Sequence, residues 1–213
     1  MNATTTLRVK ALLDIPAATT THDAVLDNFV GAVSKRIEVF IDRPLVQAAR
    51  TEEYDLKPRQ RVIFLRSYPL SAQGDVTSVK VATNWDFAAA TAITSTDYHA
   101  DLSTGSLHLN YSPITNYLGN NMGVAPNAVQ VIYTGGFGAI ASGSDPDATF
   151  LADYADIASA CELQVVAMWR RRDDPGRRTT KIGQYGATNE APLEFLPDVR
   201  QALLPYRRQR FGQ

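Results

Sequence analysis

The sequence has very little cysteine, which excludes a fold stabilised by intrachain disulfides. Among 213 residues only Cys161 carries a thiol. Free cysteines usually behave as small buried hydrophobes, and Cys161 falls on the apolar side of a predicted helix, so we expect an inert thiol. There is also no unbroken apolar run that could span a bilayer, and Met1 to Thr6 show no signal-peptide pattern. We therefore expect a soluble protein made in the cytoplasm, with no membrane partner.

Net charge is nearly absent as well. The formal value of -1 argues against a protein that coats nucleic acid, because such proteins are usually strongly basic. The charge is unevenly distributed, with ten Lys or Arg against five Asp or Glu over residues 169–213, and six against eight over residues 1–55. The C-terminal part is therefore the basic end of the chain.

Motifs for catalysis and nucleotide binding are missing. The sequence holds no Gly-x-Ser-x-Gly, His-Glu-x-x-His or Cys-x-x-Cys. Gly135-Gly136-Phe137-Gly138 lacks the spacing of nucleotide loops, so its glycines are better explained by unusual backbone angles. The neighbouring carboxylates Glu52-Glu53 and Asp173-Asp174 diverge without implying a pocket, and no nucleophile is spaced to serve His22. We predict no catalytic residue, no cofactor site and no enzymatic activity.

Two long amphipathic helices are predicted, one early and one late. The early helix follows capping residues at Thr19 to Asp23 and ends near Ile41, with apolar residues three or four apart. The late helix, about six turns long, follows Asp145-Pro146 as its start signal. Its apolar face carries Phe150, Tyr154, Ile157, Cys161, Val165 and Met168. We expect these two helices to pack on each other, joined by short helices at Thr6 to Ile15 and from Pro197.

The stretch between the long helices alternates in the manner of strands. Strands are predicted at Gln60 to Leu65, Asp75 to Val81, Tyr98 to Leu102, Ser106 to Tyr111 and Ala128 to Tyr133, with a long loop from Tyr111 to Pro126. The predicted class is α+β: a small helical bundle of two long helices plus short N- and C-terminal helices, with an antiparallel β-rich insertion between the long helices. The expected divisions are residues 1–44, the insertion 45–138, and 139–213, where the first and last complete the bundle.

One hairpin is predicted about Thr104-Gly105, closed by a two-residue loop. The predicted partners are Ser103 with Ser106, Leu102 with Leu107 and Asp101 with His108. This register separates an apolar face from a polar one. The polar face holds His99, Asp101 and His108, which either bind a metal such as zinc or form the solvated side of the hairpin. We predict no metal.

Two surfaces remain as candidates for function. A basic cluster consists of Arg170, Arg171, Arg172, Arg177, Arg178 and Lys181. It either faces DNA, meets an acidic neighbour or is a solvated helix end. The end of the chain mixes Leu and aromatic residues with arginine, which is typical of segments that bind other proteins, although a frayed terminus would look similar.

The order of short motifs resembles the head-tail connector (adaptor) proteins of long-tailed bacteriophages. In chain order they are Ile41-Asp42-Arg43-Pro44, Tyr68-Pro69-Leu70 before Val76-Thr77-Ser78-Val79, Asp97-Tyr98-His99-Ala100-Asp101 before Gly105, Pro126-Asn127-Ala128-Val129, Tyr133-Thr134-Gly135-Gly136-Phe137-Gly138, the long helix, and Leu204-Pro205-Tyr206-Arg207. The motifs are unspecific singly, and the resemblance rests on their order and spacing over most of the chain. The large β insertion and the loop from Tyr111 to Pro126 depart from the simplest adaptors.

The resemblance implies a structural role in a virion neck, after synthesis in the host bacterial cytoplasm. Connectors form a ring, usually of twelve copies, which docks beneath the portal protein, extends the DNA channel without sequence-specific binding, and offers a surface to stopper or tail-completion proteins. The implied portal-docking residues are Leu203, Leu204, Tyr206, Arg207, Arg208 and Phe211. Two alternatives stay open: a cell-wall glycan hydrolase, which needs a paired Glu and Asp in a cleft and would be tested at Glu52 or Glu53, and a DNA-binding module that requires Arg170 to Arg172.

Overall fold

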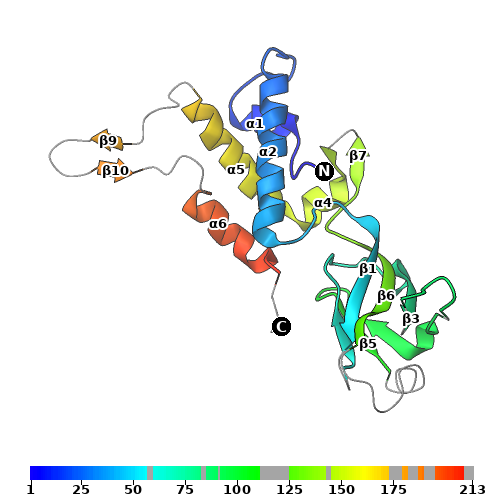
Figure 1. Cartoon of the computed structure of the whole chain (residues 1–213). Helices are drawn as coiled ribbons and strands as arrows, with labels where there is room; N and C mark the ends of the chain where they lie inside the picture. The colour runs from blue at the N-terminus through cyan, green and yellow to red at the C-terminus, as the bar shows by residue number, and fades with distance from the viewer. Residues whose placement is uncertain are drawn as a thin grey trace. The chain divides into compact units, whose positions relative to one another are not determined.

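A computed structural model describes residues 1–56, 60–82, 85–90, 92–110, 125–142, 145–172, 179–181, 187–189 and 195–208. The chain divides into two compact units (Figure 1). The helical unit comprises Met1–Leu45 and Gly138–Gln213, and the β unit comprises Val46–Phe137. The predicted α+β class, with antiparallel strands inserted between helices, is confirmed at this level.

Helix α5 lies at the centre of the helical unit and contacts α1, α2, α4 and α6. The helices are α1 Thr6–Leu12, α2 Asp23–Ile41, α4 Ala148–Asp153, α5 Ala155–Arg171 and α6 Pro197–Leu203, with the 3-10 turn η3 at Leu204–Tyr206. Two short antiparallel pairs join β7 Ile140–Ser142 to β8 Asp145–Pro146 and β9 Thr179–Lys181 to β10 Ala187–Asn189. No helix within the described ranges combines the length and the apolar character needed to cross a membrane.

Helix α2 spans the residues that its periodicity predicts. Leu26, Val30 and Val33 are fully buried, as are Ile37 and Ile41 further along the same face. The helix ends because Asp42 adopts a left-handed conformation, with φ 55°, from which its N–H reaches the carbonyl of Glu38.

The late helix is not one continuous element, which corrects the prediction. Tyr154, with φ -122° and ψ 41°, interrupts it between α4 and α5. The helical start is also later than predicted, because Pro146 belongs to β8 and Asp147 is the cap, accepting a 2.8 Å hydrogen bond from the N–H of Phe150. Phe150 and Ile157 are both buried. The break therefore preserves the buried face and leaves the sequence periodicity unchanged.

The first residues of the chain are buried against α2 and α5. The N–H of Ala3 donates to Ser34 Oγ at 2.8 Å, and the Thr4 hydroxyl donates to Glu162 Oε1 at 2.7 Å. Arg8 forms an ion pair with the same carboxylate at 2.6 Å. Burial raises the pKa of the neighbouring Cys161 thiol to about 12, which agrees with the inert thiol expected from sequence.

Two three-stranded antiparallel sheets enclose one core in the β unit. The strands are β1 Ala48–Leu56, β2 Val62–Phe64, β3 Val76–Val81, β4 Tyr98–Ala100, β5 Ser106–Leu109 and β6 Ala125–Gly135. Their orders are β1-β6-β3 and β2-β5-β4. Ile63 and Leu107 from one sheet join Val79, Val131 and Tyr133 from the other in a single buried cluster.

The predicted hairpin exists in a register that differs by two residues. Ala100 pairs with Leu107, and His99 with His108. A longer loop is stabilised because Asp101 Oδ1 accepts hydrogen bonds from the N–H of Ser103 at 3.0 Å and of Thr104 at 3.2 Å. Gly105 completes the turn with φ 65°. A shift of two leaves every side chain on its predicted face.

The polar face of this hairpin shows no metal centre in the part of the chain that the structure describes. His99 and His108 lie opposite each other, but no group of three potential ligands is found among the described residues. Hydrogen bonds from the Ser103 hydroxyl and the loop lower the pKa of Asp101 to about 2, so its carboxylate is committed to the turn.

Candidate docking surfaces of the helical unit

The last described segment is fastened to the end of α2. The N–H of Arg208 donates to the carbonyl of Ile41 at 2.8 Å, and Arg43 Nε donates to the carbonyl of Tyr206 at 2.8 Å. Arg43 is itself buried, so this contact lies inside the unit. The left-handed turn at Asp42 precedes Arg43 directly. The end of α2 therefore holds η3 and the residues after it in place.

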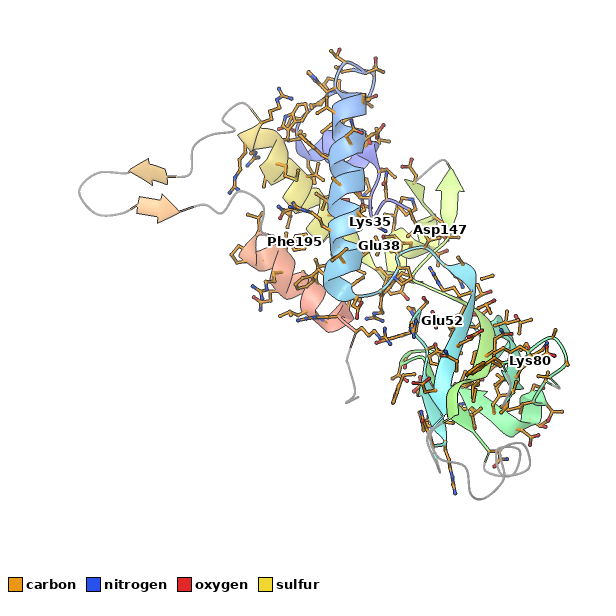
Figure 2. The ribbon with its side chains drawn as sticks, in the orientation of Figure 1. Lys35, Glu38, Glu52, Lys80, Asp147 and Phe195 are labelled. Carbon is orange, nitrogen blue, oxygen red and sulfur yellow. The ribbon has the colours of Figure 1, made fainter. Side chains whose placement is uncertain are left out.

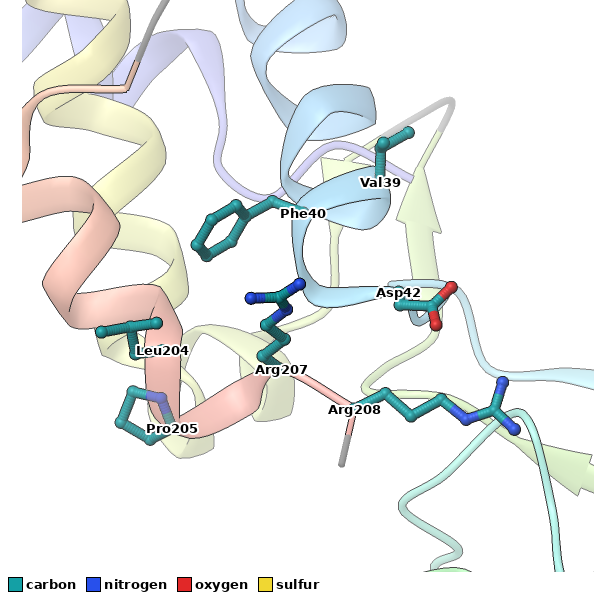
Figure 3. A pocket seen from close by; sticks show the side chains of 7 residues that line it. All are labelled: Val39, Phe40, Asp42, Leu204, Pro205, Arg207 and Arg208. Atoms are coloured by element: carbon teal, nitrogen blue, oxygen red, sulfur yellow. The ribbon is translucent and has the colours of Figure 1, made fainter. Parts of the chain in front are cut away.

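A groove, here called the C-terminal groove, lies between the end of α2 and this segment (Figure 3). Its lining is Val39, Phe40, Asp42, Leu204, Pro205, Arg207 and Arg208. Figure 3 shows Arg207 pointing toward Phe40, and its guanidinium carbon is 5.8 Å from that ring's centroid. Leu204 is 50% exposed. The groove thus offers apolar surface and cationic groups together, a combination suited to protein binding.

The docking residues suggested by the resemblance have different environments. Leu203 is fully buried, so its side chain packs in the core and not on the surface. Tyr206 is partly buried, and its hydroxyl donates to Asp156 Oδ2 at 3.4 Å. Leu204, Arg207 and Arg208 line the C-terminal groove. Phe211 lies outside the described residues.

A second groove, the α2 groove, adjoins the first and shares Val39 and Phe40 with it. Its lining is Ala32, Lys35, Arg36, Val39, Phe40 and Phe195. Figure 2 labels Lys35 on α2 and Phe195 just before α6. The rings of Phe40 and Phe195 meet edge to face at 5.5 Å. Val39 is 75% exposed. This groove was not predicted from the sequence, although Val39 lies off the predicted apolar face of α2.

The basic cluster is only partly described. Arg170, Arg171 and Arg172 are exposed at the end of α5. The guanidinium carbon of Arg172 lies 3.6 Å from the ring centroid of Trp169, and the ring of His22 meets Trp169 edge to face at 5.2 Å. His22 therefore packs as an aromatic neighbour. Lys181 ends β9, and Arg177 and Arg178 fall outside the described residues.

Glu52 and Glu53 do not form an acid-base pair. They are successive residues of β1 and so face opposite sides of the sheet. Glu52 Oε2 accepts hydrogen bonds from the Tyr54 hydroxyl and, at 2.7 Å, from the Tyr133 hydroxyl. Burial, reinforced by this carboxylate, raises the pKa of Tyr133 to about 12 and also raises that of Tyr54. The arrangement ties β1 to the core. The other carboxylate pair, Asp173-Asp174, lies outside the described residues.

Replacing Arg43 by alanine should loosen the end of the chain. Removing the guanidinium leaves the Tyr206 carbonyl without its 2.8 Å donor, and a lost hydrogen bond from a charged donor costs about 1.5–3 kcal/mol. We expect amides of residues 204–208 to exchange with deuterium at least about tenfold faster. Mass spectrometry of peptic peptides measures this.

Arg170→Ala is the matched control, because Arg170 is exposed at the other end of the unit. It should leave exchange over residues 204–208 unchanged. Equal exchange in the Arg43→Ala variant and the wild type would show that the segment is held by other contacts.

The fold can be compared with known proteins. No protein-family model and no curated protein matches the chain. Among solved structures, it is similar to a chain of the neck of an empty GTA particle computed with C6 symmetry, with a TM-score of 0.56, 16% identity, and coverage of 99% of this chain and 92% of that one. A chain of the native neck computed with C12 symmetry gives a TM-score of 0.52, 16% identity, and coverage of 97% and 91%.

A chain from the virion of the native gene transfer agent (GTA) particle gives a TM-score of 0.52 with 17% identity, over 97% of this chain and 92% of that one. At these identities the likeness concerns the fold. It nevertheless extends over nearly the whole of both chains, so the fold is not that of an isolated shared domain. The resemblance to head-tail connector proteins suggested by the sequence is therefore confirmed at the level of the fold.

Proposed function

We propose that this chain is a structural adaptor in the neck of a phage-like particle. Copies of it form a ring, of twelve subunits, beneath the portal protein; the ring extends the DNA channel and offers a docking surface to stopper or tail-completion proteins. The observation that carries the proposal is the near full-length likeness of fold to chains of GTA necks, two of which were computed with C6 and C12 symmetry.

Assembly, not catalysis, is then the mechanism. A head-to-tail contact repeated about an axis closes into a ring, and the two rims of that ring differ because the subunit has no two-fold symmetry. Each contact can be modest, since closure makes the contacts multivalent. Such a ring is located at the virion neck after synthesis in the host cytoplasm.

The C-terminal groove is our candidate for the portal side. Leu204 supplies exposed apolar surface, and Arg207 and Arg208 supply charge. Tyr206 and the buried Leu203 hold this surface in place, and Phe211 continues the same segment. Arginines at protein interfaces give both packing area and directed hydrogen bonds, so this set suits a partner with apolar and acidic side chains.

The size of the assembled particle tests the proposal. Purified full-length chain, alone and mixed with portal protein, should form closed rings that are visible in negative-stain micrographs. Because head-to-tail contacts close into a ring, the native mass should be that of about twelve subunits. A chain that is monomeric in both conditions would overturn the proposal.

A matched pair of variants tests the portal side. Leu204→Asp places a charge in the C-terminal groove and should abolish portal binding, whereas Leu163→Asp, at a 51% exposed position of α5, should not. If the Leu204→Asp variant bound portal protein as the wild type does, the C-terminal groove would not be the portal-docking surface.

A DNA-binding module is the second candidate, favoured by the exposed Arg170, Arg171 and Arg172. Retention of the monomer on DNA at physiological salt, lost when these arginines are replaced by alanine, would favour it over a ring that only surrounds DNA. We do not propose a glycan hydrolase, because Glu52 is hydrogen-bonded to two tyrosines and Glu53 faces the other way.

A further inference from the structure

Helix α2 carries two different charged features on opposite sides. Arg36 lies nine residues after Asp27, about two and a half turns at 3.6 residues per turn, so the two side chains project in opposite directions. Arg36 borders the α2 groove beside Lys35. Asp27 accepts a hydrogen bond from the Thr6 hydroxyl. Arg36 and Asp27 therefore place opposite charges on opposite sides of α2.

The anionic side also bears a protruding apolar residue. Leu7 follows Thr6 directly in α1 and is 60% exposed. Since the Thr6 hydroxyl contacts Asp27, the backbone of Leu7 lies one residue away from that contact. Leu7 and Asp27 together are called the α1 knob. An exposed leucine beside a carboxylate is the complement of an apolar groove bordered by cations.

The α2 groove has the features of a receiving site. Val39, 75% exposed, and the edge-to-face pair Phe40 and Phe195 form its apolar floor. Lys35 stands at the rim, paired at 2.8 Å with Glu38. A leucine side chain that entered would lose its water contacts against aromatic and aliphatic carbon, the kind of burial that carries most interface energy.

We propose that the α2 groove of one subunit receives the α1 knob of the next copy of this chain, with Leu7 against Val39 and Asp27 near Arg36. The inference rests on the proposed ring and names the contact that builds it. Because the groove and the knob lie on different sides of one helix, the contact is heterologous: each subunit receives one neighbour and enters another. Such contacts continue from copy to copy until the ring closes.

A cysteine pair tests the contact. The double variant Leu7→Cys/Val39→Cys should give a ladder of covalent multimers under mild oxidation, in the free chain at high concentration and in assembled rings. Distance excludes a disulfide between positions 7 and 39 of one subunit. Position 7 is next to Thr6, which contacts Asp27, and Asp27 is about 18 Å from Val39 along α2 at 1.5 Å per residue. A disulfide needs Cα atoms within about 7 Å. Cys161 is buried and does not compete.

Controls separate this contact from chance collision. Either single-cysteine variant should give dimers at most, and the pair Leu163→Cys/Val39→Cys should give no ladder, since Leu163 is 51% exposed on α5 and lies outside the proposed contact. Rings visible by microscopy in which Leu7→Cys/Val39→Cys gives no bands beyond the dimer would overturn the inference and leave the proposed function standing.

A charge exchange supplies an independent measurement. Arg36→Glu and Asp27→Arg should each weaken self-association at least about tenfold, and the double variant should recover most of that loss. A double variant as weak as the singles would overturn the pairing. If Val39→Asp leaves the ring intact and abolishes portal binding, the groove belongs to the portal and the inference fails. Absence of any ring in the wild-type chain would instead overturn the proposed function.

Discussion

Gly136→Ala is expected to destabilise the β unit by about 3 kcal/mol or more, because backbone strain and overpacking act together there. Gly136 has φ 137°, a conformation that side chains rarely allow. A Cβ at this position would lie 2.3 Å from the carbonyl oxygen of Val46 and 2.6 Å from its carbon. Both are backbone atoms and cannot rotate away. The Gly136 N–H also donates to the carbonyl of Pro69 at 3.1 Å, so a shift would break that bond.

Gly74→Ala is the control for this prediction, because no atom lies within 4 Å of a Cβ built there. It should leave stability unchanged within about 0.5 kcal/mol. Urea unfolding followed by hydrogen exchange over residues 125–135 measures the β unit separately from the helical unit. Equal urea midpoints for the two variants would contradict the close approach of Val46 to Gly136.

The sequence predicted those helices and strands whose apolar residues recur with a regular local spacing. Helix α2 carries five fully buried aliphatic residues at helical spacing, so its bounds were readable. Strand β1 was missed, because Ala48–Leu56 has no apolar alternation and is organised by pairing with β6 from Ala48 opposite Gly135 to Leu56 opposite Ala125. Pairing with a distant strand leaves no local pattern.

The hairpin and the late helix show a related limit. Periodicity indicates only which face of the sheet a side chain occupies, so the faces of Ala100 and Leu107 were predicted correctly. A register shift of two residues leaves those faces unchanged and therefore was not detected. In the same way, Phe150 and Ile157 kept their common face across the break at Tyr154. Hydrogen bonds accepted by single carboxylates stabilise the longer loop, at Asp101, and the later helix start, at Asp147.

The sequence predicted which residue types form the candidate docking site, but not which residues come together there. A terminal segment rich in leucine, tyrosine and arginine pointed to docking, yet the structure buries Leu203 and adds Val39 and Phe40, which come from a helix some 160 residues earlier. Arg43 and the Ile41 carbonyl help to form that groove, because both bind the end of the chain. A contact between such distant residues cannot be read from one sequence without a fold.

Phe150→Ala should destabilise the helical unit by about 3–5 kcal/mol, the usual cost of removing a fully buried aromatic ring. The ring is fully buried, and its centroid lies 5.7 Å from that of Tyr154, the residue that joins α4 to α5. Gly138 leaves room for it, since a Cβ there would lie 2.7 Å from the Phe150 Cβ. The cavity would therefore form between α4, α5 and the segment at Gly138.

Unfolding of the helical unit can be followed by Trp169 fluorescence in a Trp85→Phe background, because Trp85 belongs to the β unit and is largely exposed. Leu163→Ala, at an exposed position of α5, should change the free energy of unfolding by less than about 0.5 kcal/mol. Phe150→Ala should also weaken ring assembly, since α2, which contributes residues to both grooves, packs on α5. A variant with a wild-type midpoint would show that the joint at Tyr154 contributes little to the unit. Lost stability with unchanged assembly would show instead that the grooves do not depend on that joint.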